Sequence, residues 1–213
     1  MKSLMEIMNK DYDLFCFDLD GTIIDSTGLM RNAWREVNKK FNLGIDFSHY
    51  LKFVGLPFPD ILDNLNIKDH EEIMQTFFEY TSRNSDQIKL HQGVLEFIHY
   101  LKKNNKKVFI ITSKIRKNSE QIINKFSIPC DGLFCGDDPI PHKPSGKLIK
   151  YILNEFNFSN RDKVIYFGDM LVDVLFSINC SIDYCHCDFG IDGALPKELI
   201  VKYKSIASWG DIY

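Results

Sequence analysis

The 213-residue sequence lacks features that would indicate a membrane, secreted or nucleic-acid-binding protein. No apolar stretch approaches the roughly 20 residues that a membrane-spanning helix needs. The formal net charge is only −3, so no basic surface is expected to attract nucleic acid. The N-terminal stretch MKSLMEIMNKDYD mixes charged and apolar residues and lacks the continuous apolar segment of a signal peptide. We therefore expect a cytoplasmic protein without a membrane or nucleic-acid partner.

The sequence also gives no sign of a disulfide framework, because its six cysteines stand mostly in apolar or strand-like surroundings. In a cytoplasmic protein they are expected to be reduced core residues rather than a disulfide framework. Cys185, His186 and Cys187 form a close group of zinc-binding residue types, but no second pair completes a tetrahedral site. The alternative is a strand whose alternate side chains are buried, and the sequence does not decide whether this group has any role.

Short β-type segments alternate with helical patterns along most of the chain. Strands that alternate with helices of this length predict an α/β fold, with a parallel sheet covered by helices on both faces. The β-type segments are residues 14–17, 108–111, 133–135, 164–167 and 181–187, and the helical patterns are residues 94–105, 119–126, 147–156 and 172–179.

One interval, residues 27–89, breaks this alternation because it contains helical patterns and no convincing strand. The interval follows the first β-type segment at once, so it is predicted to be an all-helical insert. The expected organisation is an α/β core domain of residues 1–26 and 90–213, interrupted by a helical domain of residues 27–89.

Two carboxylates, Asp18 and Asp20, follow the first β-type segment directly. Ligands of open α/β sheets bind at the carboxyl ends of the strands, where these side chains are expected. Carboxylates this close repel each other unless a cation lies beside them or one holds a proton, and Mg²⁺ prefers oxygen ligands. Gly21 permits a sharp turn and Thr22 offers a hydroxyl. Taken alone, the acidic pair could also cap or solvate the turn.

Polar side chains also follow two other β-type segments and occupy one loop. Thr112 and Ser113 follow VFII and offer hydroxyls suited to phosphate oxygens. Lys143, in HKPSG, is a point charge that could neutralise a phosphate and a nucleophile. Asp169 follows VIYFG, and Asp173 comes four residues later on the next helix. Each residue alone has an explanation as a helix cap or a solvated side chain, but the ordered set favours a phosphate site.

This ordered set resembles the motifs of the haloacid dehalogenase superfamily, in particular its phosphoglycolate phosphatase-like group. FDLDGTIIDS is similar to the first motif and its hinge, and HQGVLEFIHYLKKNNKKVFIITSK is similar to the segment that leads from the cap into the second motif. GLFCGDDPIPHKP is similar to the third motif, and VIYFGDMLVDVLFSINC is similar to the fourth. The resemblance spans about residues 12–190. It implies a Rossmann-like three-layer core with a helical cap at residues 27–89. It also implies a Mg²⁺-dependent phosphatase of a small phosphorylated metabolite, as a monomer or homodimer.

The resemblance further implies the role of each acidic residue. Asp18 is expected to be the nucleophile that forms an aspartyl-phosphate, and Asp20 the acid and base that serves the leaving oxygen and the attacking water. Mg²⁺ is expected to be held by Asp18, the backbone carbonyl of Asp20 and Asp169. Asp173 is expected to orient Lys143 or a water on the metal. The carboxylate of Asp20 argues against dehalogenation, because a leaving halide needs no proton.

The phosphoryl group is expected to bind hydroxyl and backbone donors. The resemblance implies that Thr112, or else Ser113, donates a hydroxyl hydrogen bond to it. It also implies that Gly21, Thr22 and Ser113 supply backbone N–H groups. Such donors position the phosphoryl group and stabilise its charge, which are the main needs of phosphoryl transfer.

Residues 53–59, FVGLPFP, are the part of the cap expected to contact the leaving group of the substrate. Gly55 would give this loop mobility, whereas Phe53 and Phe58 would provide apolar contacts or pack within the cap. The substrate is expected to be small, because a closed cap excludes a protein or polymer. Arg31, Arg35 and Lys52 could reach a second anionic group on the substrate, although a solvated helix charge is the simpler expectation for each. His49 and His91 could make polar contacts at the cap interface, although solvent exposure is again the simpler expectation.

Two other functions are compatible with parts of this pattern. A phosphosugar mutase of the β-phosphoglucomutase type shares the cap and all four motifs, but it must protect its aspartyl-phosphate from water until a sugar hydroxyl arrives. Turnover of a simple aryl phosphate without a bisphosphate activator distinguishes the phosphatase from the mutase. A non-catalytic binding module would require the loss of at least one motif residue, and all of them are present.

Overall fold

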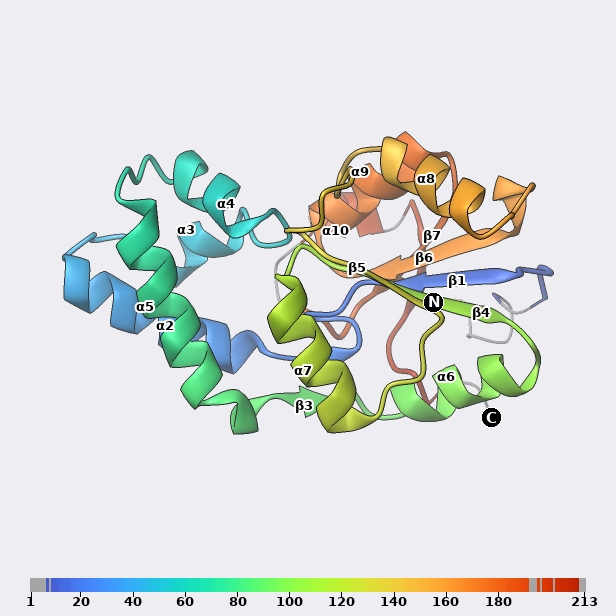
Figure 1. The fold of residues 1–213 in the computed structure, drawn as a ribbon, viewed down its shortest axis with the longest axis horizontal. Coiled ribbons are helices and arrows are strands. Elements are labelled where there is room, and N and C mark those ends of the chain that lie inside the picture. The colour runs from blue at the N-terminus through green and yellow to red at the C-terminus, as the bar shows by residue number, and fades with distance from the viewer. Residues whose placement is uncertain (1–6, 8, 192–194, 196, 201, 211–213) are drawn as a thin grey trace.

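The computed structural model describes residues 7, 9–191, 195, 197–200 and 202–210. Its centre is a parallel sheet of six strands with helices on both faces (Figure 1), so the predicted α/β fold is confirmed. In spatial order the strands are β5 (Gly132–Phe134), β4 (Lys107–Ile111), β1 (Leu14–Phe17), β6 (Val164–Gly168), β7 (Asp183–Cys187) and β8 (Lys204–Ile206). The helices around the sheet are α6 (Val94–Lys103), α7 (Arg116–Phe126), α8 (Lys147–Glu155), α9 (Leu171–Cys180) and α10 (Lys197–Ile200), with the 3-10 helix η2 (Arg161–Lys163). In the described part of the chain, no helix combines the length and apolar character needed to cross a membrane.

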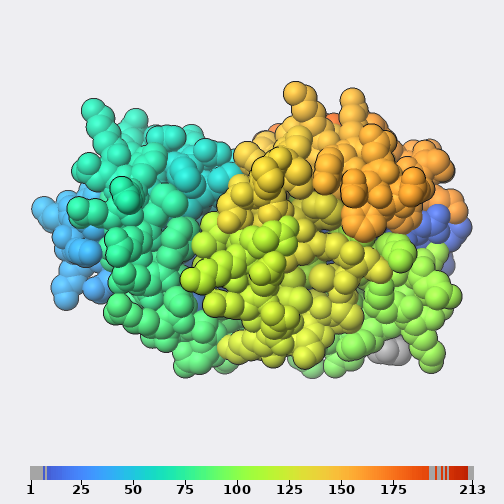
Figure 2. All heavy atoms as spheres, in the orientation of Figure 1, coloured from blue at the N-terminus to red at the C-terminus, as the bar shows by residue number. Residues whose placement is uncertain are grey.

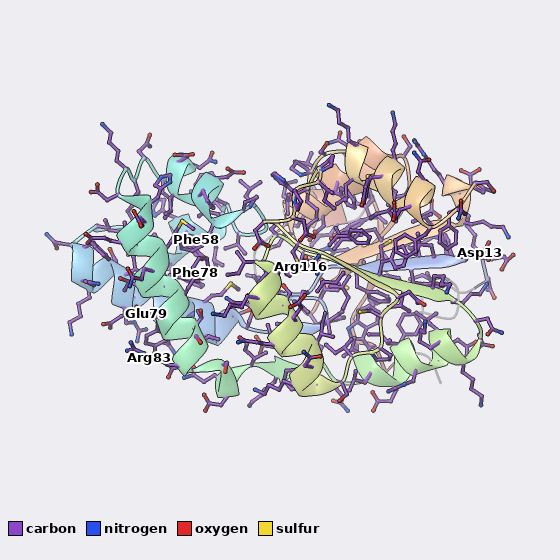
Figure 3. The ribbon with its side chains drawn as sticks, viewed as in Figure 1. Asp13, Phe58, Phe78, Glu79, Arg83 and Arg116 are labelled. Atoms are coloured by element: carbon purple, nitrogen blue, oxygen red, sulfur yellow. The ribbon has the colours of Figure 1, made fainter. Side chains whose placement is uncertain are left out.

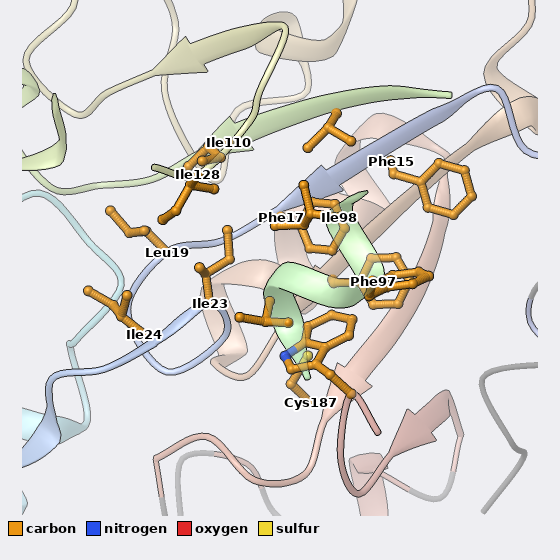
Figure 4. Packing of buried hydrophobic residues seen from close by; sticks show 14 of the residues in the cluster. Phe15, Phe17, Leu19, Ile23, Ile24, Phe97, Ile98, Ile110, Ile128 and Cys187 are labelled. Carbon is orange, nitrogen blue, oxygen red and sulfur yellow. The ribbon is translucent and has the colours of Figure 1, made fainter. Parts of the chain in front are cut away.

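Alternate side chains of the central strand pack against opposite layers of helices. Phe15 and Phe17 of β1 join an apolar cluster with Phe97 of α6 on one face, part of which is drawn in Figure 4. Leu14 and Cys16 join a second cluster with residues of α8 and α9 on the other face. All four residues of β1 are buried. A strand covered on both faces is a continuous apolar run rather than an alternating one, which is why the sequence shows it clearly.

Strand β1 lies where the chain reverses its direction of travel across the sheet. From β1 the chain continues to β4 and β5 on one side, and later to β6, β7 and β8 on the other. Phe17, the last residue of β1, is in register with Ile110 of β4 and Phe167 of β6. The carboxyl ends of these three strands therefore meet at one place, which is where open α/β sheets bind their ligands.

The chain between β1 and α6 forms a layer of helices at one end of the molecule (Figure 1, Figure 2). This layer, which we call the cap, contains α2 (Thr27–Phe41), α3 (Phe47–Leu51), α4 (Phe58–Asn64), α5 (His70–Arg83) and the 3-10 helix η1 (Ser85–Gln87). The helices pack around an apolar cluster in which Trp34 stacks on Tyr50, with ring centroids 4.6 Å apart. The predicted helical insert after the first strand is therefore present.

Two short strands that were not predicted join the cap to the sheet. β2 (Ile24–Asp25) pairs antiparallel with β3 (Lys89–Leu90), so the chain leaves and re-enters the core side by side. We propose that this pair marks the boundary between a core domain of residues 1–26 and 90–213 and a cap domain of residues 27–89.

The cap contacts the core directly in this structure. Met170, Val172 and Ile191 of the core belong to the apolar cluster of the cap. Gly55 of the cap approaches the core so closely that a Cβ there would lie 2.3 Å from Cγ1 of Val172. Its φ of +99° is also one that residues other than glycine rarely adopt. The Ser113 hydroxyl donates a hydrogen bond to the carbonyl oxygen of Gly55. The loop of residues 53–59 is therefore held against the residues that follow β4.

The group Cys185, His186 and Cys187 lies on β7, and its side chains alternate between the faces of the sheet. The two cysteines belong to the apolar cluster that contains Phe15. His186 instead contacts Tyr184, whose hydroxyl lies 3.1 Å from Nδ1 of the imidazole and whose ring packs in the other cluster. The interpretation as a buried strand is confirmed, with burial on both faces rather than one, because helices cover both faces.

Candidate active site

Three neighbouring strands end in polar side chains that converge at the carboxyl edge of the sheet. Asp18 follows β1, Thr112 follows β4 and Asp169 follows β6; Asp18 is 5% exposed and Asp169 is 1% exposed. The strand ladders hold the backbone here, because the Asp18 N–H donates to the Phe167 carbonyl (2.8 Å) and the Thr112 N–H to the Phe134 carbonyl (2.9 Å). The structure thus brings together groups that are about 90 and 150 residues apart in the sequence.

Lys143 reaches the same place from the loop between β5 and α8. Its Nζ lies 2.6 Å from Oδ1 of Asp18, 2.7 Å from Oδ1 of Asp173 and 3.0 Å from the Tyr166 hydroxyl. The lysine side chain is only 1% exposed. The Tyr166 hydroxyl in turn lies 3.0 Å from Oδ1 of Asp173. One buried ammonium group is therefore shared by two carboxylates, and Tyr166, which was not predicted, is its third partner.

The charge balance at this place is negative, because three buried carboxylates face one lysine. Burial raises the pKa of Asp18 to about 7, although Lys143 opposes the rise. Burial, with Asp173 and Asp18 nearby, raises the pKa of Asp169 well above its usual range. Burial would lower the pKa of Lys143, but Asp173 and Asp18 outweigh it and raise that pKa. The lysine therefore stays charged, and the carboxylates together need more positive charge than it supplies.

A divalent cation fits this deficit. Carboxylate oxygens of Asp18, Asp169 and Asp173 lie within 4.8 Å of one another, and all three residues are buried. The Asp169 oxygens accept hydrogen bonds from the Thr22 hydroxyl (3.3 Å) and the Ile191 N–H (3.0 Å). A carboxylate oxygen has about two lone pairs, so these bonds leave Asp169 able to bind a metal. The donor set consists of oxygen, which suits Mg²⁺.

Local backbone geometry holds the acidic side chains in place. Oδ2 of Asp173, in the first turn of α9, accepts hydrogen bonds from the N–H groups of Asp169 (3.2 Å) and Met170 (2.9 Å). Gly21 has a φ of +82°, and a Cβ there would lie 2.2 Å from Oδ2 of Asp169. Glycine at this position therefore lets the turn after β1 pass close to the carboxylate that follows β6.

Asp20 has a different set of partners on the cap side of the cluster. Its carboxylate lies 3.1 Å from Nζ of Lys114 and accepts a hydrogen bond from the Ser26 hydroxyl (2.5 Å). These two contacts fix the orientation of the Asp20 carboxyl group. Neither Lys114 nor Ser26 was among the predicted site residues, although Lys114 directly follows Thr112 and Ser113 at the end of a predicted strand.

A cavity of about 610 Å³ lies between the cap and these carboxylates. Phe58 is one of its cap residues, and Figure 3 shows it on the side of the cap that faces the core. Phe53 instead packs against the apolar cluster of the cap. The predicted site residues that line the cavity are Asp18, Asp20, Thr112, Ser113, Gly55 and Phe58.

The remaining cap candidates lie mostly at the surface, where Arg31, Arg35, His49 and Lys52 are exposed as expected. The same expectation is wrong for His91. Its ring packs 4.8 Å from that of Phe189, and its Nε2 is buried with no hydrogen-bond partner among the described residues. Burial lowers the pKa of His91. The residue is half-buried because it directly follows β3, at the junction of cap and core.

Sequence comparison identifies the family of the chain. The family model described as haloacid dehalogenase-like hydrolase matches residues 15–187, and the chain belongs to this family. The chain is 27% identical over 192 residues to a protein of Caldanaerobacter subterraneus that is provisionally named pyrophosphatase PpaX, covering 88% of this chain and 86% of that one. It is 24% identical over 168 residues to the phosphorylated carbohydrates phosphatase of Thermotoga maritima, covering 72% and 74%.

Solved structures share the fold. A crystal structure from Bacteroides fragilis, provisionally described as a haloacid dehalogenase-like hydrolase, matches with a TM-score of 0.82 at 20% sequence identity. The match covers 95% of this chain and 100% of the other. The resemblance seen in the four sequence motifs is thus confirmed at the level of family and fold.

Proposed function

We propose that the protein is a Mg²⁺-dependent phosphatase that hydrolyses a small phosphate monoester through an aspartyl-phosphate on Asp18. The observation that carries the proposal is that Asp18, held by Lys143 at 2.6 Å, lines the cavity together with Asp20. A carboxylate fixed in one orientation is suited to attack phosphorus, and a second carboxyl group beside it is suited to proton transfer. The names of the two relatives, a pyrophosphatase and a phosphorylated carbohydrates phosphatase, support hydrolysis of a phosphoryl bond.

The proposed reaction has two displacements at phosphorus. In the first, a carboxylate oxygen of Asp18 attacks phosphorus, the bond to the ester oxygen breaks, and Asp20 gives that oxygen a proton. In the second, Asp20 takes a proton from water, the water oxygen attacks phosphorus, and the bond to Asp18 breaks. Inorganic phosphate leaves, both carboxyl groups return to their starting states, and each ester consumes one water.

Hydroxyl groups at the end of β4 would bind the phosphoryl oxygens. The Ser113 hydroxyl already donates to the Gly55 carbonyl. Oγ1 of Thr112 instead accepts a hydrogen bond from the Lys114 N–H (3.2 Å), so its own proton can be donated to phosphate. These contacts favour Thr112 over Ser113 as the hydroxyl donor in the reaction.

Backbone donors in the turn after β1 would complete the phosphate site. The N–H of Gly21 donates to the Ile24 carbonyl (2.7 Å), so it is engaged within the turn itself. We therefore assign the phosphate contacts to the N–H groups of Thr22 and Ser113. Gly21 contributes instead through the close approach that it allows toward Asp169.

The metal would be held by the carboxylates of Asp18 and Asp169 and by the backbone carbonyl of Asp20. When bound there, Mg²⁺ supplies positive charge that offsets the phosphoryl oxygens and the buried acids. Asp173 is paired with Lys143 at 2.7 Å and holds the lysine against Asp18.

Replacing the proposed nucleophile tests the function. Asp18→Asn should reduce hydrolysis of an aryl phosphate to below roughly 1% of wild type, since an amide cannot form the acyl phosphate. Asp162→Asn, an exposed change before β6, is the matched control and should retain full activity. Both variants should give wild-type circular dichroism spectra and cooperative melts. Retained turnover by Asp18→Asn would contradict the proposal. An absolute requirement of the wild type for a bisphosphate activator would indicate the mutase instead.

A further inference from the structure

The cavity above Asp18 has two chemically different walls, and the cap wall is aromatic. The ring centroid of Phe58 lies 4.6 Å from that of Phe77 and 5.3 Å from that of Phe78, and all three residues line the cavity. Figure 3 shows Phe58 and Phe78 on the side of the cap that faces α7. Met74 extends the wall by one turn of α5. One side of any molecule in the cavity therefore meets a continuous apolar surface.

The opposite wall comes from α7 and is mixed in character. Asn118, Gln121 and Lys125 line the cavity at spacings of three and four residues, so they share one face of this helix. Ile122 lies among them and also lines the cavity. The other side of a bound molecule therefore meets side-chain amides around an apolar centre.

The size and charge of the cavity argue against a small occupant with two anionic groups. A volume of about 610 Å³ lies within the roughly 300–1,000 Å³ that encloses a drug-sized ligand. Among the described residues that line the cavity, the cations are Lys114 and Lys125. Lys114 is paired with Asp20 at 3.1 Å, and Lys125 donates to the Ser85 carbonyl at 2.8 Å. A second phosphate or a carboxylate would compete for cations that already have partners.

The carboxylates of Asp18 and Asp20 belong to the same cavity, so a substrate that places its phosphate on Asp18 places its leaving group between these walls. We propose that the substrate is a phosphate monoester whose leaving group carries an aromatic ring system with polar atoms on one edge. The ring lies against the phenylalanines of the cap, and the polar edge meets Asn118 and Gln121. This inference rests on the proposed phosphatase function and names its substrate class. Stacked or edge-on rings add attraction beyond the area that they bury.

Esters of alcohols with similar acidity test the substrate class. Ethyl, phenethyl and naphthylethyl phosphate differ little in leaving-group chemistry, so differences in kcat/KM report contacts in the cavity. We expect kcat/KM to rise roughly tenfold or more from the ethyl to the naphthylethyl ester. Pyrophosphate should rank below both aryl-bearing esters. Equal values for ethyl and naphthylethyl phosphate, or a preference for pyrophosphate, would overturn the inference and leave the phosphatase proposal intact.

A variant of the cap wall tests where the ring binds. Phe78→Ala, at a half-buried position, should lower kcat/KM for naphthylethyl phosphate about tenfold. It should leave ethyl phosphate within about twofold, because the ethyl group does not reach this wall. Phe41→Ala is the matched control, because Phe41 packs against the same apolar cluster from the end of α2, and it should change neither ester. An equal loss for both esters in Phe78→Ala would indicate a merely structural role and overturn the assignment.

Equilibrium binding separates this inference from the proposed function. Naphthylethylphosphonate, which cannot be hydrolysed, should bind the wild type more tightly than ethylphosphonate in titration calorimetry, and Phe78→Ala should reduce the difference. If this result holds while no ester is turned over, the inference about the cavity stands and the phosphatase proposal fails. If the two phosphonates bind the wild type equally well, the inference fails even when esters are hydrolysed.

Discussion

Replacing Lys143 with methionine tests how the buried charges at the strand ends are held together. The lysine side chain is 1% exposed and lies 2.6 Å from Asp18 and 2.7 Å from Asp173. Methionine keeps most of the apolar volume but removes the charge, so two buried carboxylates lose their shared cation. Breaking a buried pair in this way costs about 3–5 kcal/mol of unfolding free energy. For a chain of this size the melting temperature should fall by roughly 6–20 °C.

The cost of Lys143→Met should depend on pH, because the carboxylates can take up protons instead. Burial raises the pKa of Asp18 to about 7 and Lys143 opposes that rise, so loss of the lysine moves this pKa further up. A group whose pKa is higher in the folded than in the unfolded state destabilises the fold as the pH rises between the two values. The loss of stability should therefore be smaller at about pH 5 than at about pH 8.

Unfolding by urea in EDTA at both pH values, followed by circular dichroism, measures this effect. Lys10→Met is the matched control, because Lys10 pairs with Asp183 at 2.8 Å with 44% of its side chain exposed. Such a surface pair is worth about 0–1 kcal/mol. A cost for Lys143→Met no larger than that of the control, or one that is the same at both pH values, would refute the reasoning.

Three further predictions concern the core surface, the cap loop and the metal. Burial raises the pKa of Asp131, but Lys102 at 2.5 Å outweighs it and holds that pKa low; Asp131→Asn should therefore cost about 1 kcal/mol near pH 7. An aspartate whose pKa is lowered on folding stabilises the fold only when the pH is above its folded-state pKa. Urea melts should therefore show that the cost of Asp131→Asn disappears as the pH falls through that pKa. Gly55→Ala should lower the melting temperature, because its Cβ would meet Val172 at 2.3 Å, whereas Gly28→Ala, with no atom within 4 Å, should not. In a turnover assay, EDTA should abolish activity and Mg²⁺ should restore it, whereas Ca²⁺, with its larger and looser coordination, should fail to do so.

The longer strands and helices could be predicted because each gives a repeated signal. Residues 14–17 are apolar at every position, and β1 has these same bounds. The strands β2 and β3 have two residues each, too few for a pattern to develop within them. β8 has three, of which only Ile206 is apolar, whereas the equally short β5 could be predicted from the adjacent apolar residues Leu133 and Phe134. The existence of β2, β3 and β8 depends on pairing with partners that are distant in the sequence, which local composition does not reveal.

The acidic residues of the site could be anticipated because they follow buried strands, and parallel strands bring their carboxyl ends together. The hydrogen-bond and ion-pair partners of these acidic residues could not be anticipated, because each contact depends on where a side chain points. Tyr166 stands inside an apolar strand like any core aromatic residue, yet its hydroxyl contacts Lys143. Lys114 and Ser26 lie in segments that were expected to hold a strand end and a hinge, and only the folded chain turns both toward Asp20.

Trapping the covalent intermediate tests the central claim, that Asp18 becomes phosphorylated, most directly. Asp20→Ala should still accept phosphate from an aryl ester with a good leaving group but should lose the base for the second displacement, so the aspartyl-phosphate accumulates. Rapid acid quench, borohydride reduction and peptide mass spectrometry then convert and locate it. The account predicts homoserine at position 18 in Asp20→Ala treated with substrate, and none without substrate or when Asp18→Asn is added. Substrate hydrolysis by the wild type, together with an unmodified aspartate at position 18 in the trapped Asp20→Ala variant, would contradict it.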